Sequence, residues 1–184
     1  MTIDDAGLAA RARNGDSKAF TELVSRHQDR VFRFLLRMIG SREEAMDITQ
    51  ETFMKAWQAM PRWRPEAQFG TWLLQIARNG ALDVLRRGSV VAFEPLDDAL
   101  PVADPAATPE QRVEARRRVE SLDAALRALP PEHREVLLLR EVEDLSYAEI
   151  AQALDVAEGT VKSRIARARA ALLAIFAPDR GKTS

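Results

Sequence analysis

The segment Gly88–Thr108 constrains the fold more than any other part of the chain, because it interrupts a sequence that is otherwise helical in character. It holds four acidic residues, three prolines and no Lys or Arg. Proline removes a helical hydrogen bond and clashes with the preceding turn, so neither flanking helix continues through it. Unstructured loops of about 20 residues are uncommon inside compact domains. We therefore expect two small domains, residues 1–90 and 109–184, joined by a flexible acidic linker over residues 91–108; one domain with a long internal loop is the alternative.

Both flanks of this segment show helical spacing of apolar residues and no sustained alternation typical of strands. Ser41 and Ser146 each precede a Glu by three residues, and Thr108 precedes Gln111 by three, which are the patterns of helix N-capping boxes. The predicted fold class is therefore all-α. The helices are expected at residues 5–14, 17–39, 42–60, 69–87, about 109–129, 131–142, 147–154 and from about 160 onward.

Composition excludes several classes of site. The 184-residue chain has no Cys, and its two histidines, His27 and His133, are far apart. Disulfides, thiolate zinc sites and Cys nucleophiles are therefore excluded, and no catalytic set, metal site or cofactor site is expected. The sequence shows no apolar run of membrane-spanning length and no apolar signal-peptide core at its N-terminus. We expect a cytoplasmic protein that is not an enzyme and does not insert into membranes.

Residues 145–172 have the pattern of a helix-turn-helix. Two helical segments flank a turn of about five residues, and the second segment has one apolar stripe at helical spacing. The stripe consists of Val161, Ile165, Ala168 and Leu172. This geometry predicts that the C-terminal domain places its second helix on duplex DNA.

Charge indicates which helix contacts the DNA. Residues 141–158 include six acids and no base, whereas residues 160–173 include four bases and no acid. The acidic part is repelled by phosphates, so the second helix is expected to enter the major groove. The alternative is a helical hairpin whose arginines form an ordinary solvated face.

Two stretches of the sequence resemble domains of a known protein family. The stretch LPPEHREVLLLREVEDLSYAEIAQALDVAEGTVKSRIARARAAL resembles the C-terminal domain of bacterial RNA polymerase sigma factors of the extracytoplasmic-function group. DITQETFMKAWQAMPRWRPEAQFGTWLLQIARNGALDVLRR resembles the promoter-melting domain of the same group. The resemblance implies that the N-terminal domain binds the beta-prime clamp of core RNA polymerase and the minus-ten strand. It implies that the C-terminal domain reads the minus-35 duplex and rests on the beta flap, and that an anti-sigma factor holds the protein inactive.

The resemblance and the charge pattern together assign three sets of residues. Core polymerase is expected to contact Asp47, Gln50, Glu51 and Met54, on the face of the helix at 42–60 opposite its apolar side. Minus-ten DNA is expected to contact Arg78, Asn79, Arg86 and Arg87. Minus-35 DNA is expected to contact Thr160, Lys162, Ser163, Arg164, Arg167 and Arg169. Met46 stands where the group usually has an acid, so the sequence departs from the group's clamp-binding pattern at this position.

For several side chains in these regions, packing in the core or capping a helix is the alternative to a role in binding. Phe53 and Trp57 fall on the predicted apolar face of the helix at 42–60, and Phe53 is expected to be a core anchor. Residues 62–87 combine bases with aromatics, as single-strand binding surfaces do, but the spacing of Trp72 favours the core. Asn79 is expected to hydrogen-bond a flipped base, with a helix-capping role as the alternative.

Two other functions also fit parts of the sequence. A helix-turn-helix regulator that binds duplex DNA without polymerase explains the C-terminal motif but not the basic and aromatic segment at 62–87. A small helical enzyme or an adaptor is the third alternative, and the enzyme is disfavoured because no catalytic constellation is visible. Promoter recognition as a polymerase subunit accounts for both halves of the chain.

Overall fold

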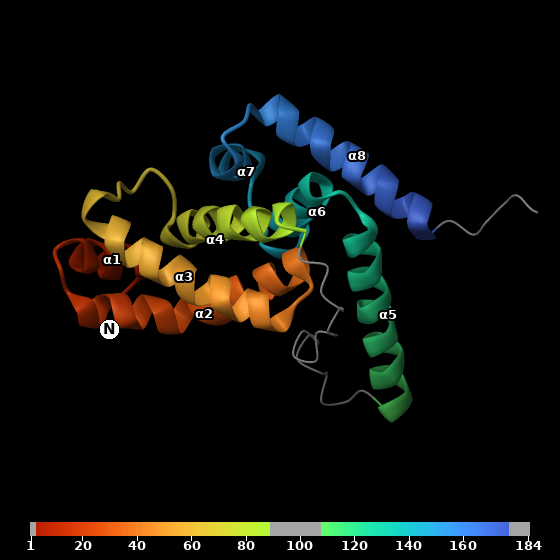
Figure 1. Ribbon diagram of the computed structural model, residues 1–184, viewed down its shortest axis with the longest axis horizontal. Helices are drawn as coiled ribbons and strands as arrows, with labels where there is room; N and C mark the ends of the chain where they lie inside the picture. The colour runs from red at the N-terminus through yellow and green to blue at the C-terminus, as the bar shows by residue number, and fades with distance from the viewer. Residues whose placement is uncertain (1–2, 89–107, 177–184) are drawn as a thin grey trace, which may run out of the picture.

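Every regular element of the described chain is a helix. The computed structural model describes residues 3–88 and 108–176 (Figure 1). The elements are α1 (Asp5–Arg13), α2 (Ser17–Ile39), α3 (Arg42–Ala59), η1 (Met60–Arg62), α4 (Phe69–Arg86), α5 (Pro109–Ala128), α6 (Pro131–Leu137), η2 (Leu138–Val142), α7 (Tyr147–Leu154) and α8 (Glu158–Phe176). This confirms the all-α prediction. The linker predicted at 91–108, apart from Thr108, lies outside the described residues.

The first four helices form one bundle, called here the N-terminal bundle (residues 3–88). The helix ends follow from local chemistry: the Asp16 carboxylate accepts hydrogen bonds from two backbone N–H groups at the start of α2, and Ser41 caps α3. Gly40 ends α2 with a φ of 86°, a conformation that glycine adopts without strain. Fully buried Phe34, Leu23 and similar side chains fill the centre. Each such side chain contributes about 1.5–3 kcal/mol by leaving water.

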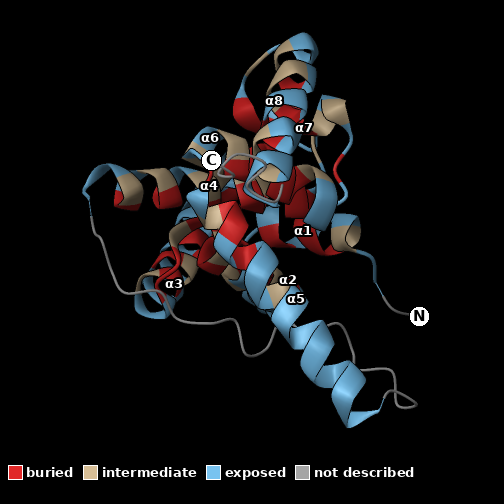
Figure 2. Cartoon of the chain, turned by 90° about the vertical axis from the view of Figure 1, so that its right-hand side faces the viewer, coloured by how far each residue is buried: buried red, intermediate tan, exposed pale blue. Residues whose placement is uncertain are grey.

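The remaining helices form the C-terminal bundle (residues 108–176). Both capping boxes predicted for it are present, at Thr108–Gln111 and at Ser146–Glu149. The helix from Pro131 extends through a π-helical turn to Val142, which confirms the predicted extent. The N-terminal half of α5 runs away from the rest of the molecule, and its side chains are exposed (Figures 1 and 2).

The last helix begins at Glu158, two residues earlier than expected. Its first hydrogen bonds run from the N–H groups of Thr160 and Val161 to the carbonyl oxygen of Ala157, at 2.9 and 3.2 Å. Ala157 provides no capping side-chain oxygen. The Glu158 carboxylate lies in the first turn instead, where the positive end of the helix dipole favours it.

The two bundles pack against each other. Figure 1 shows α7 lying over α4, and Gln152 and Ala153 of α7 lie beside Thr71 and Trp72 in the first part of α4. Buried apolar side chains from both bundles belong to one continuous core. Arg134 of α6 is buried there and donates to the carbonyl oxygens of Leu126 and Leu129, at 3.1 and 3.2 Å, and to that of Met38 at the end of α2. The bundles are therefore joined by hydrogen bonds as well as by apolar packing. Their contact fixes the relative positions of the sites described next.

Candidate nucleic-acid interface

The helix-turn-helix consists of α7, a three-residue turn and α8. Asp155 ends α7 in the left-handed conformation, with a φ of 53°, which Asp tolerates better than most residues. Val161, Ile165 and Ala168 of α8 are buried, as the apolar stripe predicted, whereas Leu172, the fourth residue of the stripe, is half-buried. The turn and the stripe together fix which sides of α8 remain available for a ligand.

The six side chains predicted to contact minus-35 DNA divide between two sides of α8. Thr160, Ser163, Arg164 and Arg167 follow one another at intervals of three, one and three residues, so they share one face. Within this face an Arg167 Nη2 donates to Ser163 Oγ at 3.2 Å. The face is suited to a phosphate or a base edge, because it offers guanidinium and hydroxyl donors together.

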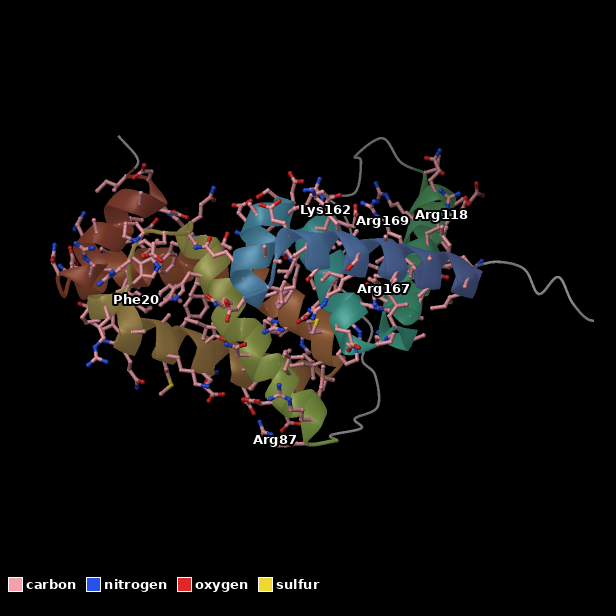
Figure 3. All side chains as sticks on the ribbon, turned by 90° about the horizontal axis from the view of Figure 1, so that it is seen from above. Phe20, Arg87, Arg118, Lys162, Arg167 and Arg169 are labelled. Carbon is pink, nitrogen blue, oxygen red and sulfur yellow. The ribbon has the colours of Figure 1, made fainter. Side chains whose placement is uncertain are left out.

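Lys162 and Arg169 are seven residues apart and lie along the other edge of α8 (Figure 3). Arg169 forms an ion pair with Glu141 at 2.5 Å, and this hydrogen bond raises the pKa of the Arg169 guanidinium. The Lys162 ammonium lies 5.8 Å from the centre of the Tyr147 ring. Both cations therefore face groups of neighbouring elements in their own bundle, whereas the partner of Arg167, Ser163, lies on α8 itself.

Arg78 and Asn79 lie in the middle of α4. Asn79 is exposed, and its Oδ1 accepts a hydrogen bond from Arg78 Nη1 at 3.2 Å. Because α4 runs without a break from Phe69 to Arg86, the capping alternative for Asn79 is wrong. Arg78 pairs with Glu135 of the C-terminal bundle, with Nε 2.7 Å from Oε2.

Arg86 and Arg87 lie at the end of α4. Figure 3 shows Arg87 far from the labelled cations of α8. Arg86 forms an exposed ion pair with Asp83 at 3.1 Å. Arg87 lines a crevice between α3 and α4 together with Asp47 and Glu51. The structure thus brings one residue predicted to contact minus-ten DNA beside two predicted to contact polymerase.

The aromatic residues that follow α3 form a cluster. Ring centroids are 6.0 Å apart for Trp63 and Phe69, 5.7 Å for Phe69 and Trp72, and 5.8 Å for Trp63 and Trp72. Phe69 is buried, whereas both tryptophans are half-buried. The tryptophans keep surface in a crevice whose other walls include Arg62 and Arg64. Trp72 is therefore both packed on the core and accessible beside cations, a combination that suits an unstacked base.

The predicted polymerase face of α3 is exposed and continuous. Asp47, Gln50, Glu51 and Met54 are all exposed, with Met54 at 62%. The expectation that Phe53 is a core anchor is confirmed, because this side chain is buried.

Trp57, predicted on the apolar face of α3 with Phe53, lies at the exposed edge of that face. Trp57 is 37% exposed and its ring centroid lies 4.9 Å from that of Phe20 across an apolar groove between α2 and α3. The sequence spacing indicates this position, because Trp57 follows Gln50 by seven residues and Met54 by three, which places all three on one side of a helix. All three side chains line the groove.

Two further observations concern sites of other kinds. In residues 3–88 and 108–176, His, Asp and Glu side chains nowhere gather in threes as metal ligands would. No helix in the same ranges is both long enough and apolar enough to span a bilayer.

Comparison with known families gives two matches. Residues 23–90 match the family described as "Sigma-70 region 2", and residues 119–172 match "Sigma-70, region 4". The first range contains α3 and α4 with the predicted polymerase and minus-ten residues. The second contains the helix-turn-helix.

Individual relatives span both bundles. The chain is 38% identical to the ECF RNA polymerase sigma factor SigE of Mycolicibacterium smegmatis over 98% of this chain and 72% of the relative. It is 37% identical to the ECF RNA polymerase sigma-E factor of Haemophilus influenzae over 91% of this chain and 92% of the relative.

Solved structures show the same fold. CnrH, solved in complex with the cytosolic domain of CnrY, matches with a TM-score of 0.68 at 29% identity over 92% of this chain and 94% of CnrH. The sigma factor RpoE of Bartonella quintana, solved with the anti-sigma factor NepR, has a TM-score of 0.68 at 24% identity over 89% of this chain and 99% of RpoE.

Proposed function

The chain belongs to the extracytoplasmic-function group of the sigma-70 family, and we propose that it directs core RNA polymerase to specific promoters and helps to open their minus-ten region. The observation that carries the proposal is the face of α8 formed by Thr160, Ser163, Arg164 and Arg167. It lies beside the buried stripe on the second helix of a helix-turn-helix, the helix that this motif presents to the major groove.

The N-terminal bundle supports the second part of the proposal. Opening a promoter requires a protein to hold unpaired bases, which costs a few kcal/mol per extruded base and is offset by stacking and hydrogen bonding. The crevice beside Trp63 and Trp72 offers flat aromatic surface next to Arg62 and Arg64. Asn79 adds an exposed amide on α4, and Arg86 and Arg87 add cations near its end.

Binding of core polymerase is assigned to α3. Asp47, Gln50, Glu51 and Met54 form one exposed face, and the groove beside Trp57 extends it with apolar surface. Exposed Met and Trp side chains are enriched at protein-binding surfaces, and the carboxylates of this face would repel DNA phosphates. The resemblance implies the beta-prime clamp as the partner here, and the beta flap as the partner of the C-terminal bundle.

A second protein partner is also proposed. CnrH, which shares this fold at 29% identity, was solved with the cytosolic domain of CnrY bound. We extend this to the present chain as control by an anti-sigma factor that holds the protein away from polymerase. A cytoplasmic location is expected for a protein that acts on polymerase and promoter DNA.

A reconstituted transcription assay tests the proposal. The purified protein is added to core RNA polymerase with fragmented genomic DNA of its own host, and the 5′ ends of the transcripts are sequenced. Discrete start sites that share upstream elements are expected only when the protein is present. If no start site depends on the protein while it still binds duplex DNA alone, the polymerase role is wrong and a polymerase-independent regulator is favoured.

A further inference from the structure

Glu135 of α6 is a buried carboxylate that binds an arginine from the other bundle. Its side chain is 2% exposed, and its two oxygens accept hydrogen bonds from Arg78 of α4. Nε of Arg78 lies 2.7 Å from Oε2, and Nη2 lies 3.3 Å from Oε1. This two-point contact is the geometry in which guanidinium binds a carboxylate or a phosphate most strongly.

The same carboxylate also faces an arginine of the helix-turn-helix. Nη1 of Arg164 in α8 lies 4.0 Å from Oε1 of Glu135. Arg78 and Arg164 belong to the two separate surfaces assigned above to minus-ten and minus-35 DNA. One buried carboxylate therefore lies within ion-pair distance of a cation from each proposed DNA-binding surface.

Two more ion pairs join an arginine of the N-terminal bundle to an acid of the C-terminal bundle. Arg30 of α2 binds Glu143 at 2.5 Å, and Arg37 of α2 lies 3.6 Å from Asp123 of α5. Asp123 is buried, and this burial raises the pKa of its carboxyl even though Arg37 and Arg127 oppose the shift. In these pairs the N-terminal bundle supplies the arginine and the C-terminal bundle supplies the carboxylate. A DNA phosphate would offer these arginines the same negative charge.

The helix-turn-helix also covers the aromatic crevice. Gln152 and Ala153 of α7 line it together with Trp63 and Trp72. The Gln152 amide donates to the carbonyl oxygen of Glu66 in the loop before α4, at 3.3 Å. The first helix of the DNA-reading motif thus forms one wall of the crevice proposed to hold unpaired bases.

We infer that this arrangement is a closed, autoinhibited state in which the acids of the C-terminal bundle stand in for DNA phosphates. The inference rests on the function proposed above. A guanidinium held by a carboxylate at two points is not free for phosphate, so Arg78 binds either Glu135 or DNA. Promoter binding then requires the bundles to separate, and anything that binds the open form shifts the population toward it.

Domain separation is measured first, independently of DNA. The natural chain has no Cys, so Lys18→Cys in α2 and Ala170→Cys in α8 give two exposed thiols for a donor and an acceptor dye. Glu135→Gln, which removes the charge and keeps the shape, is expected to lower the energy transfer between the dyes. Glu132→Gln, an exposed carboxylate of the same helix, is the matched control and leaves the transfer unchanged. Equal transfer in wild type and Glu135→Gln overturns the inference.

A reversible crosslink supplies a test that does not depend on the stability of the Glu135 variant. Glu66→Cys and Gln152→Cys are joined by a short reducible bis-methanethiosulfonate linker, because the two residues are in contact in the closed form. The probe is a fluorescein-labelled single-stranded oligonucleotide of random sequence. The linked protein is expected to bind it at least about tenfold more weakly than the reduced protein, since apparent affinity falls with the fraction of competent molecules. Equal binding before and after reduction contradicts the inference.

The energy-transfer and crosslinking experiments together distinguish a failure of this inference from a failure of the proposed function. If Glu135→Gln lowers the energy transfer but neither the open variant nor the reduced protein binds the oligonucleotide, the closed contact exists and the DNA-binding assignment is wrong. If the transfer does not change while the protein still supports promoter-specific transcription, the proposed function stands and autoinhibition is wrong.

Discussion

Gly80 of α4 lies so close to Ile48 of α3 that a Cβ built on Gly80 would be 2.7 Å from Ile48 Cγ2. Ile48 is buried, so neither it nor the helix moves away easily. Gly80→Ala is expected to destabilise the protein by about 1–3 kcal/mol through overpacking, which outweighs the gain of about 1 kcal/mol in helix propensity. Urea unfolding followed by circular dichroism measures the free energy of unfolding.

Gly159 provides the control for Gly80. It lies in the first turn of α8, and a Cβ built there meets nothing within 4 Å. Gly159→Ala is therefore expected to leave the free energy of unfolding unchanged or to raise it by up to about 1 kcal/mol. A Gly80→Ala protein as stable as Gly159→Ala would show that α3 and α4 are not held at this distance.

Asp5 gives the stability of the N-terminal bundle a dependence on pH. Burial raises the pKa of its carboxyl, but hydrogen bonds from His27 and Arg26 outweigh this and leave it below the ordinary value of 3.8. Nε2 of His27 lies 2.6 Å from Asp5 Oδ2. Because the pKa is lower in the folded state, the stabilisation is fully present above about pH 4 and is lost as the pH falls through the folded value.

Asp5→Asn tests this dependence. The variant is expected to have a lower Tm than wild type at pH 7, and the gap is expected to close as the pH falls toward about 3. Asp29→Asn, an exposed position on α2, controls for the loss of one negative charge. A Tm gap that stays constant from neutral to acid pH would assign the effect of Asp5 to packing or to the start of α1 rather than to ionisation.

Features that depend on neighbouring residues could be predicted from the sequence. The capping boxes at Thr108–Gln111 and Ser146–Glu149 are formed, because each depends on side chains three residues apart. The ends of most helices fall within about two residues of the prediction for the same reason. The buried stripe of α8 followed from helical spacing alone.

Contacts between the bundles could not be predicted in this way. Arg78 and Glu135 are 57 positions apart, and nothing in the local pattern of either residue indicates the other. Arg78 was therefore assigned to DNA without its partner. Helical spacing placed Trp57 on the apolar face of α3, but spacing alone did not indicate that the Trp57 ring would be exposed in a groove beside Gln50 and Met54. Both cases concern tertiary packing, which periodicity does not determine.

The exposed face of α3 is expected to capture polymerase. Replacing Gln50 and Glu51 together with Ala should weaken co-purification with core polymerase by about tenfold or more, because side chains at the centre of an interface contribute most of its binding energy. The change should not alter duplex DNA binding. Glu114→Ala with Glu120→Ala, two exposed acids of α5, is the matched control. Undiminished capture by the α3 variant, measured with immobilised polymerase, would remove this face from the interface.

The two sides of α8 are expected to contribute differently to minus-35 binding. Arg167 lies on the face shared with Thr160 and Ser163, whereas Lys162 lies along the opposite edge, over Tyr147 (Figure 3). Both Arg167→Ala and Lys162→Ala should weaken binding to duplex promoter DNA selected by the transcription assay, and Arg167→Ala should weaken it more. Arg118→Ala on exposed α5, whose partner is Glu114, should leave binding unchanged and serves as the control.

Salt dependence distinguishes a phosphate contact from a base contact at Arg167. Loss of one phosphate contact reduces the slope of log affinity against log salt by about 1 and weakens all sequences alike. Loss of a base contact leaves the slope nearly unchanged and costs about 1–3 kcal/mol on the cognate sequence alone. Either result supports docking of α8 through the face that carries Arg167. An unchanged affinity of Arg167→Ala for both cognate and unrelated duplexes, across the salt series, would show that α8 docks through a different face.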